Sequence, residues 1–133
     1  MRIIELMKEK QGVLIGMVHC LPLPGAMNHC GSMDAVVAKA VADAKKLEQA
    51  GFDAVLVEPT LDRPMGMTRG PLQLAAMSVI CGAVHQVVSV PMGVSFMTAD
   101  CGDLFAIARA SGADFVRITA FVDTVRFLSL IHI

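Results

Sequence analysis

The first strong pattern in the chain is an apolar run from Val13 to His19, without a formal charge. The run leads into a loop that contains Pro22, Pro24 and Gly25, so the apolar stretch ends abruptly. Strands of parallel sheets are covered on both faces and therefore consist of nearly continuous apolar residues. The pattern predicts a buried strand over residues 13–19, with His19 at its C-terminal end.

Three further units of helix and strand are predicted after this first strand. The expected helices start after Ser32, at Pro71 and after Asp100, because Ser and Asp are good N-caps and Pro is favoured in the first turn. Their apolar residues recur at three- and four-residue steps. The expected strands cover residues 53–58, 90–96 and 114–119. A short amphipathic segment near the N-terminus is expected either to plug the bottom of a barrel or to fray.

An internal repeat supports this arrangement. The segment AGFDAVLVE (Ala50 to Glu58) matches SGADFVRIT (Ser111 to Thr119), each with a helix end, Gly, one residue, Asp and a strand. Repeated units without a hairpin signal such as Asn-Gly predict an α/β fold with a parallel sheet. A closed barrel and an open doubly wound sheet both fit, although no GxGxxG motif follows the first strand to favour dinucleotide binding.

The composition excludes several classes of protein. The chain of 133 residues is 55% hydrophobic, yet no apolar run approaches the ~20 residues that span a bilayer. The net charge of -1 and the absence of Trp and Tyr argue against nucleic-acid binding. Charges within the first ten residues argue against an export signal. We therefore expect a cytoplasmic protein, at most peripheral to a membrane.

The four cysteines and four histidines do not form a recognisable metal motif. Cys20, Cys30, Cys81 and Cys101 are too widely spaced for a CxxC pair, so reduced thiols in the core are expected. The pairs His19-Cys20 and His29-Cys30 suggest zinc only weakly, since their spacing matches no compact site. His85 is expected on a solvent-facing helix surface. No metal and no cofactor are predicted.

Several motifs together resemble the BtpA family. They are IGMVHCLPLPG, the strand end at Glu58 with Asp62 and Pro64 beyond it, QLAAMSVI, PMGVSFMTAD and ASGADFVRI. The resemblance extends from Val13 to Arg117 and implies a TIM barrel of the ribulose-phosphate-binding type. Because such barrels have ~250 residues, residues 1–133 are expected to form a single truncated domain with about half of the eight-stranded barrel. Residues 127–133 no longer follow the family and are expected to be a non-native tail.

The resemblance also implies functional residues. It implies His19, Glu58 and Arg117 as catalytic residues and Asp62 and Asp100 as ligand-binding residues. Arg69, in the loop before a predicted helix, and Thr119, at the end of the fourth predicted strand, are also expected to bind the ligand. The chain departs from the usual family pattern where Asn is common, with Pro59 after the second strand, Ser95 in the third and Thr119 after the fourth. It also has Thr98-Ala99-Asp100 in place of an Arg-Asn-Asp run. Each lost amide or guanidinium removes a possible hydrogen bond to a ligand.

Each candidate also has a structural interpretation. Alternation along the strands places Glu58 and Arg117 on the inward face, where they could form a structural ion pair or could bind a ligand. His19 could act as an acid or base, could bind a metal together with Glu58, or could simply hydrogen-bond to the loops around it. The segment GMTRGP with Arg69 could hold a phosphate at the following helix, but an ordinary loop is the more frequent meaning of such a segment.

Two functions follow as hypotheses. The first is an enzyme-like TIM barrel for a small phosphorylated or carboxylated metabolite, with Glu58 and His19 for proton transfer and Arg117 for the anion. The second is a non-catalytic biogenesis factor that uses the barrel to bind a membrane protein complex such as photosystem I. A homo-oligomer is expected for the full-length protein, and a half-barrel alone is expected to associate because its strand edges and one sheet face stay uncovered.

Overall fold

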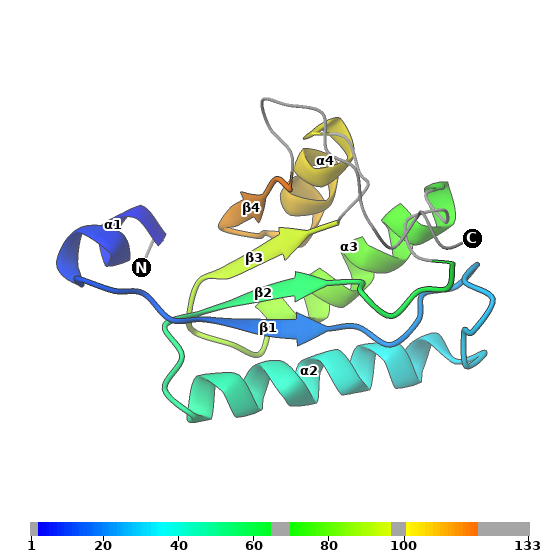
Figure 1. Cartoon of the computed structure of the whole chain (residues 1–133), viewed down its shortest axis with the longest axis horizontal. Coiled ribbons are helices and arrows are strands. Elements are labelled where there is room, and N and C mark those ends of the chain that lie inside the picture. The colour runs from blue at the N-terminus through cyan, green and yellow to red at the C-terminus, as the bar shows by residue number, and fades with distance from the viewer. Residues whose placement is uncertain (1–2, 65–69, 97–100, 120–133) are drawn as a thin grey trace.

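The computed structural model describes residues 3–64, 70–96 and 101–119. Helices and strands alternate along these residues (Figure 1). The elements are α1 (Ile3–Glu9), β1 (Ile15–His19), α2 (Met33–Gln49), β2 (Ala54–Glu58), α3 (Pro71–His85), β3 (Met92–Ser95), α4 (Cys101–Ser111) and β4 (Phe115–Arg117). The predicted α/β class with a parallel sheet is therefore confirmed.

The strands that the structure describes form one parallel sheet in the order β1-β2-β3-β4. The order follows the chain without the reversal that defines a doubly wound sheet. Helices α2, α3 and α4 contribute to a single core with one face of the sheet, which we call the outer face. The opposite face is called the inner face. Helix α1 lies near the N-terminal ends of the strands (Figure 1).

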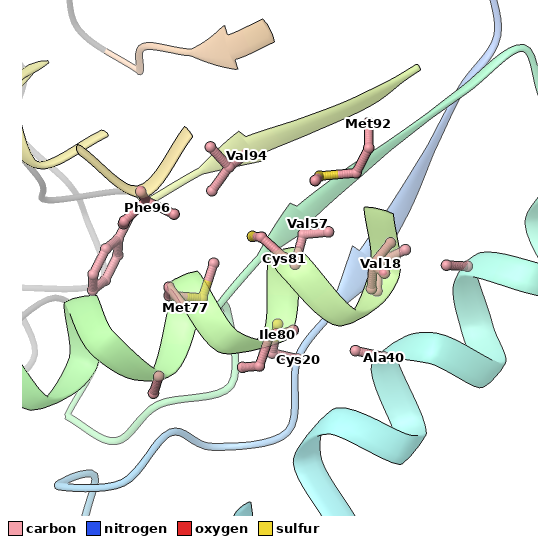
Figure 2. Close-up of a cluster of buried hydrophobic side chains, with 14 of the residues drawn as sticks. Val18, Cys20, Ala40, Val57, Met77, Ile80, Cys81, Met92, Val94 and Phe96 are labelled. Atoms are coloured by element: carbon pink, nitrogen blue, oxygen red, sulfur yellow. The ribbon is translucent and has the colours of Figure 1, made fainter. Parts of the chain in front are cut away.

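The core lies between the outer face of the sheet and the three long helices. Val18, Val57 and Val94 contribute from the strands, and Ala40 and Ile80 contribute from the helices (Figure 2). All five side chains are inaccessible to solvent. Because burial of a Val or Ile side chain stabilises by about 1.5–3 kcal/mol, this layer is the main source of stability in the described part of the fold.

Helices α2 and α3 begin where they were predicted to begin, but part of the predicted buried face of α3 is exposed. Ser32 caps α2, since its Oγ accepts a hydrogen bond from the amide of Ala35 at 3.2 Å. The apolar residues of α3 were expected to form one wide stripe that includes Leu72, Ala76, Ile80 and Val84. Ala76, Ile80 and Val84 are buried, but Leu72 is 56% exposed. This helix is apolar on nearly every side, so periodicity could not identify its buried face. None of the described helices is both long and apolar enough to cross a membrane.

The strands are shorter than the apolar runs that predicted them. The first run was expected to form a strand from residue 13, but β1 begins at Ile15, and β3 covers Met92–Ser95 within the expected range of 90–96. Pro91 has no N–H for the ladder. The fourth strand ends at Arg117 and does not reach Thr119. Apolar runs predicted where the strands lie, and pairing determines their ends.

The Gly-x-Asp repeat has a clear structural meaning. Gly51 and Gly112 end their helices with φ of +87° and +78°, a conformation that side chains other than Gly rarely adopt. Two residues later, Asp53 accepts the amide hydrogen of Leu14 at 3.0 Å, and Asp114 accepts that of Met92 at 3.0 Å. Each carboxylate therefore ties its own strand, β2 or β4, to the strand that precedes it in the sheet.

Glu48 near the C-terminal end of α2 provides a pH-dependent link to the segment before β3. Its Oε1 accepts hydrogen bonds from Ser89 Oγ at 2.6 Å, Ser89 N at 2.8 Å and Val90 N at 3.3 Å. The hydroxyl of Ser89, followed by the backbone amides, lowers the pKa of Glu48 below its ordinary value of 4.5. These hydrogen bonds favour the ionised form of Glu48, so they stabilise the folded state fully above the ordinary pKa. Their contribution is lost as the pH falls through the lowered pKa of the folded state.

We expect Glu48→Gln to reduce the free energy of unfolding by about 1 kcal/mol near neutral pH. The difference from the unaltered chain should shrink as the pH falls below the ordinary glutamate value. Urea unfolding followed over this pH range measures both quantities. Glu9→Gln is the matched control, because Glu9 is exposed and has no hydrogen-bond partner among the described residues. An equal loss for Glu48→Gln at all pH values would contradict the assigned role of the charge.

Candidate functional site

Four side chains at the C-terminal ends of the strands form the candidate site, which we call the strand-end cluster. It consists of His19 on β1, Glu58 on β2, Ser95 on β3 and Arg117 on β4. His19 is paired with Glu58, and Ser95 is paired with Arg117. Residues paired across parallel strands point to the same face, and the hydrogen bonds described next place Glu58 and Ser95 together. All four side chains therefore lie on the inner face, opposite the helices.

Glu58 is the centre of this cluster. It is 4% exposed, and its Oε1 accepts hydrogen bonds from Ser95 Oγ at 3.1 Å and from Nη2 of Arg117. The side chain of Arg117 is 46% exposed, so this is a buried carboxylate paired with a guanidinium that reaches solvent. The ion pair between Glu58 and Arg117, which was one of the two interpretations of their shared inward face, is present. An ionised carboxylate at this depth needs such a partner, because an unpaired buried charge is strongly destabilising.

The second carboxylate oxygen of Glu58 has a different environment. Within the described ranges, Oε2 accepts no hydrogen bond, and it is not among the fully buried atoms that lack a partner. Carboxylates can accept about four hydrogen bonds through their two oxygens. Ser95 and Arg117 thus fix the orientation of the carboxylate through Oε1. They leave Oε2 able to accept a hydrogen bond or to take up a proton from a ligand.

The sheet register explains why Arg117, and not Thr119, lies level with Glu58. The repeat aligns Glu58 with Thr119, two residues beyond Arg117. The ladder instead pairs Leu56 with Gly93 and Gly93 with Phe115, which moves β4 by two residues relative to the repeat. A shift of two preserves the face, because side chains alternate. Thr119 is exposed just after β4, and its predicted role as a ligand residue stays a prediction.

His19 is exposed at the end of β1, directly beside Glu58 in the ladder. Its ring has no hydrogen bond to any described residue, whereas the next amide, Cys20 N, donates to the carbonyl of Glu58 at 3.0 Å. Within the described residues, therefore, no hydrogen bond holds His19 to the surrounding loops, as its structural interpretation would require. The imidazole is available to a ligand on the same face as the free oxygen of Glu58.

The cysteine next to His19 points the other way. Cys20 is fully buried in the core with Ile80 (Figure 2), and burial raises the pKa of its thiol to about 12. Burial also raises the pKa of the Cys81 thiol in the same core. The expectation of a core position was wrong for Cys30 and Cys101, which are exposed. His29, of the other His-Cys pair, contacts the carbonyl of Pro22 through Nδ1 at 2.7 Å. In the described part of the chain, no three His, Cys, Asp or Glu side chains gather as a metal site would require.

Asp62, predicted to bind a ligand, is buried in a loop contact. Its Oδ1 accepts the amide hydrogen of Leu23 at 2.8 Å, which joins the loop after β2 to the loop after β1. A buried carboxylate that receives a backbone N–H stabilises the loop conformation. The structure thus gives Asp62 a structural contact, and its role toward a ligand stays a prediction.

Two amide side chains that the sequence analysis did not select hold the same two loops together. Asn28 donates to Leu61 O at 2.9 Å and accepts from Arg63 N at 3.0 Å. Gln73 donates to Pro24 O at 2.7 Å and accepts from Gly70 N at 2.9 Å. A polar residue such as Gln73 on the otherwise apolar first turn of α3 was the available signal. These contacts fix the loops at the C-terminal edge of the sheet around the strand-end cluster.

Ser95 was also not selected as a site residue, although it differs from the family pattern. It is completely buried and donates to Glu58. A hydroxyl at the end of an apolar strand was the signal that could have identified it. Two predicted ligand residues, Arg69 and Asp100, lie outside the described residues.

Comparison with known proteins identifies the relatives of this chain. An uncharacterised protein of Methanocaldococcus jannaschii is 40% identical over 109 residues, which cover 82% of this chain and 42% of that protein. An uncharacterised protein of Pyrococcus horikoshii is 38% identical over 105 residues, or 79% of this chain and 40% of that protein. The Synechocystis photosystem I biogenesis protein BtpA is 34% identical over 106 residues, which cover 79% of this chain and 37% of that protein.

The chain therefore spans about 40% of the length of the curated relatives that it matches. The match to the family model is wider than any one of the sequence motifs, because it extends over residues 10–127 and includes all the strands and long helices described above. The order of these elements and the strand-end cluster are features of that matched region. On this basis, the chain belongs to the BtpA family.

Proposed function

We propose that the strand-end cluster binds a small phosphorylated or carboxylated metabolite and supports proton transfer on it. The observation that carries this proposal is the asymmetry of Glu58. One oxygen is fixed by Ser95 and Arg117, and the other is unbonded among the described residues, on the face that His19 shares. A carboxylate fixed in this way is suited to act as a base, since its orientation is set before the ligand arrives.

Each residue has a separate part in this proposal. Arg117 binds the anionic group, because a guanidinium has five N–H donors and the hydrogen bond to Glu58 leaves several of them for the ligand. Glu58 takes a proton from the ligand through Oε2. His19 exchanges a second proton at the neighbouring strand end. Ser95 keeps the carboxylate of Glu58 oriented and does not contact the ligand.

The proposed fold of the intact site is a TIM barrel. Sequential parallel strands with the described long helices on one face are the arrangement from which such barrels are built. Active sites of these barrels lie at the C-terminal ends of the strands, where the strand-end cluster is found. A cytoplasmic location is part of the same proposal, because small metabolites of this kind are found there.

Calorimetric titration of this chain tests the proposed binding. The probes are inorganic phosphate, a small set of sugar phosphates, and small hydroxycarboxylates. We expect saturable binding of at least one probe, and we expect Arg117→Met and Glu58→Gln each to weaken it by at least about tenfold, which corresponds to about 1.4 kcal/mol. Arg109→Met, which removes an exposed arginine of α4, is the matched control and should bind as the unaltered chain does. Failure of every probe, or equal loss in the control, would refute the proposal.

A second candidate function is supported by one relative. The Synechocystis protein that is 34% identical to this chain is named as a photosystem I biogenesis protein. If this chain shares that role, the barrel acts as a binding module for a membrane protein complex during assembly and needs no catalysis. Absence of small-anion binding, together with unchanged binding of Glu58→Gln to the membrane protein complex, would favour this second function over the first.

A further inference from the structure

Helix α3 differs from the helices on either side of it because it has no charged side chain before its last turn. Residues 71–84 include no Asp, Glu, Lys or Arg. Two of its polar side chains are bonded within the chain, since Gln73 donates to Pro24 O at 2.7 Å and Ser78 donates to Leu74 O at 2.9 Å. A helix that is apolar on every side is normally covered on every side.

One face of α3 is nevertheless open to solvent. Leu72 is 56% exposed, Val79 is 57% exposed, and Ala75 is also exposed. Together with Gly82 they recur at steps of three, four and three residues, which is the spacing of a helix that contacts another helix. We call these four residues the α3 stripe. Helix α3 packs between α2 and α4, both of which are described, so the opening is not an edge of the helix layer.

A hollow of about 280 Å³ lies beside the α3 stripe, next to the start of α2. It is lined by Pro24, Met33, Leu72, Ala75, Ala76 and Val79. All of these residues are apolar, so the hollow offers no polar side chain to orient a small polar ligand. No described helix can span a membrane. An apolar face with such a hollow is therefore best covered by apolar side chains of a protein.

The charges on the neighbouring helices indicate a second copy of this chain as that protein. Helix α2 has Asp34 in its first turn and Lys46 in its last, and both are exposed. Helix α4 has Asp103 and Arg109 in the same order. If two α3 stripes pack in opposite directions, α2 faces α2 and α4 faces α4, so each acidic end lies toward a basic end. Packing in the same direction would instead bring the acidic ends of α2 and α4 together.

We propose that two copies of this chain form a dimer through the α3 stripe, with the two α3 helices antiparallel about a two-fold axis at Val79. Leu72 and Gln86 are equally distant from Val79 along the helix, so the contact is symmetric about that residue, as a two-fold interface requires. Val79 of each copy then lies against the hollow of the other. The interface is on the outer side of the molecule and leaves the strand-end cluster open, so this proposal does not depend on the proposed function.

Sedimentation of the chain over a range of concentrations, with substitutions, is the first test. We expect a dimer that Val79→Lys weakens by at least about tenfold, because the variant buries a charge at the centre of an apolar contact. Ile4→Lys is the matched control, since Ile4 is 59% exposed on α1, and it should leave the dimer intact. A monomer at every concentration would overturn the proposal, because the face would then belong to another protein. Equal effects of the two variants would also overturn it.

Disulfide cross-linking identifies the direction of the two helices. Cys30→Ser and Cys101→Ser first remove the exposed thiols. In this background, Val79→Cys should cross-link with itself under mild oxidation, because Cα atoms at the axis of two closely packed helices come within the roughly 4.4–6.8 Å that a disulfide needs. Leu72→Cys should not cross-link with itself, since its two copies would be about 20 Å apart along the helices.

A mixture of Leu72→Cys with Gln86→Cys completes this test. The antiparallel dimer brings these two positions together, so the mixture should yield the heterologous cross-link that neither variant gives alone. Absence of the Val79→Cys cross-link would overturn the proposed interface. Cross-linking of Leu72→Cys with itself as readily as Val79→Cys would overturn the antiparallel direction, because only helices packed in the same direction bring the two copies of position 72 together.

Discussion

Replacement of Arg117 by Met is expected to lower the free energy of unfolding by about 2 kcal/mol near neutral pH. The variant leaves the buried Glu58 carboxylate with Ser95 as its remaining partner among the described residues. Breaking a fully buried ion pair costs about 3–5 kcal/mol, and the expected loss is smaller here because the side chain of Arg117 is 46% exposed and solvent screens the pair. Urea unfolding of the variant and of the unaltered chain measures the difference.

A double-mutant cycle separates this pair from two independent effects. Glu58→Gln removes the other charge, and the double variant should lose less stability than the two single variants summed, by about 1 kcal/mol or more. Lys39→Met is a control for loss of a positive charge, because Lys39 pairs with Asp43 on the exposed side of α2 and such pairs contribute little. Strict additivity of the two single effects would contradict the proposed unit of Glu58 and Arg117.

Gly93→Ala is expected to destabilise the chain by about 2 kcal/mol. Gly93 lies on β3 next to Phe115 in the ladder, and a Cβ at position 93 would come within 2.3 Å of the aromatic ring. The ring would have to move off the inner face of the sheet, where it supports the strand that carries Arg117. Thermal or urea unfolding measures the loss.

Two companion variants make this prediction specific. Gly82→Ala in α3 meets nothing within 4 Å, and alanine is favoured over glycine inside a helix by about 1 kcal/mol, so this control should be neutral or stabilising. Adding Phe115→Leu to Gly93→Ala should recover part of the loss, because the smaller side chain leaves room for the new methyl group. Equal destabilisation by Gly93→Ala and Gly82→Ala would show that the contact with Phe115 is not the cause.

Much of the fold was predictable because it follows from local chemistry. The Gly-x-Asp repeat, Ser32 as a cap and Pro71 as a helix start each specify a backbone conformation through a single residue. The buried side of α3 was not predictable in the same way. Its apolar residues lie on nearly every side of the helix. The burial of Gln73 depends on its hydrogen bond to Pro24 O, which belongs to a loop distant in sequence.

The candidate site was predictable in part for a similar reason. Alternation along a strand placed Glu58 and Arg117 on one face, and the structure joins them. The two-residue shift of β4 and the hydrogen bond from Ser95 depend on how the strands pair, which the sequence of one strand does not contain. Asp62 is a residue type that often binds ligands. The hydrogen bond that it accepts from Leu23 N forms only when the loop after β1 meets the loop after β2.

The most direct test of the central claim, that a small anion binds at the strand-end cluster, is an NMR titration of this chain with a phosphate or carboxylate probe. The account predicts that the His19 imidazole and the Ser95 amide shift together with one dissociation constant. The imidazoles of His29, which contacts Pro22 O, and of the exposed His85 should stay unchanged as internal controls. A saturable probe that shifts His85 or His29 and leaves His19 and Ser95 unaltered would contradict the account.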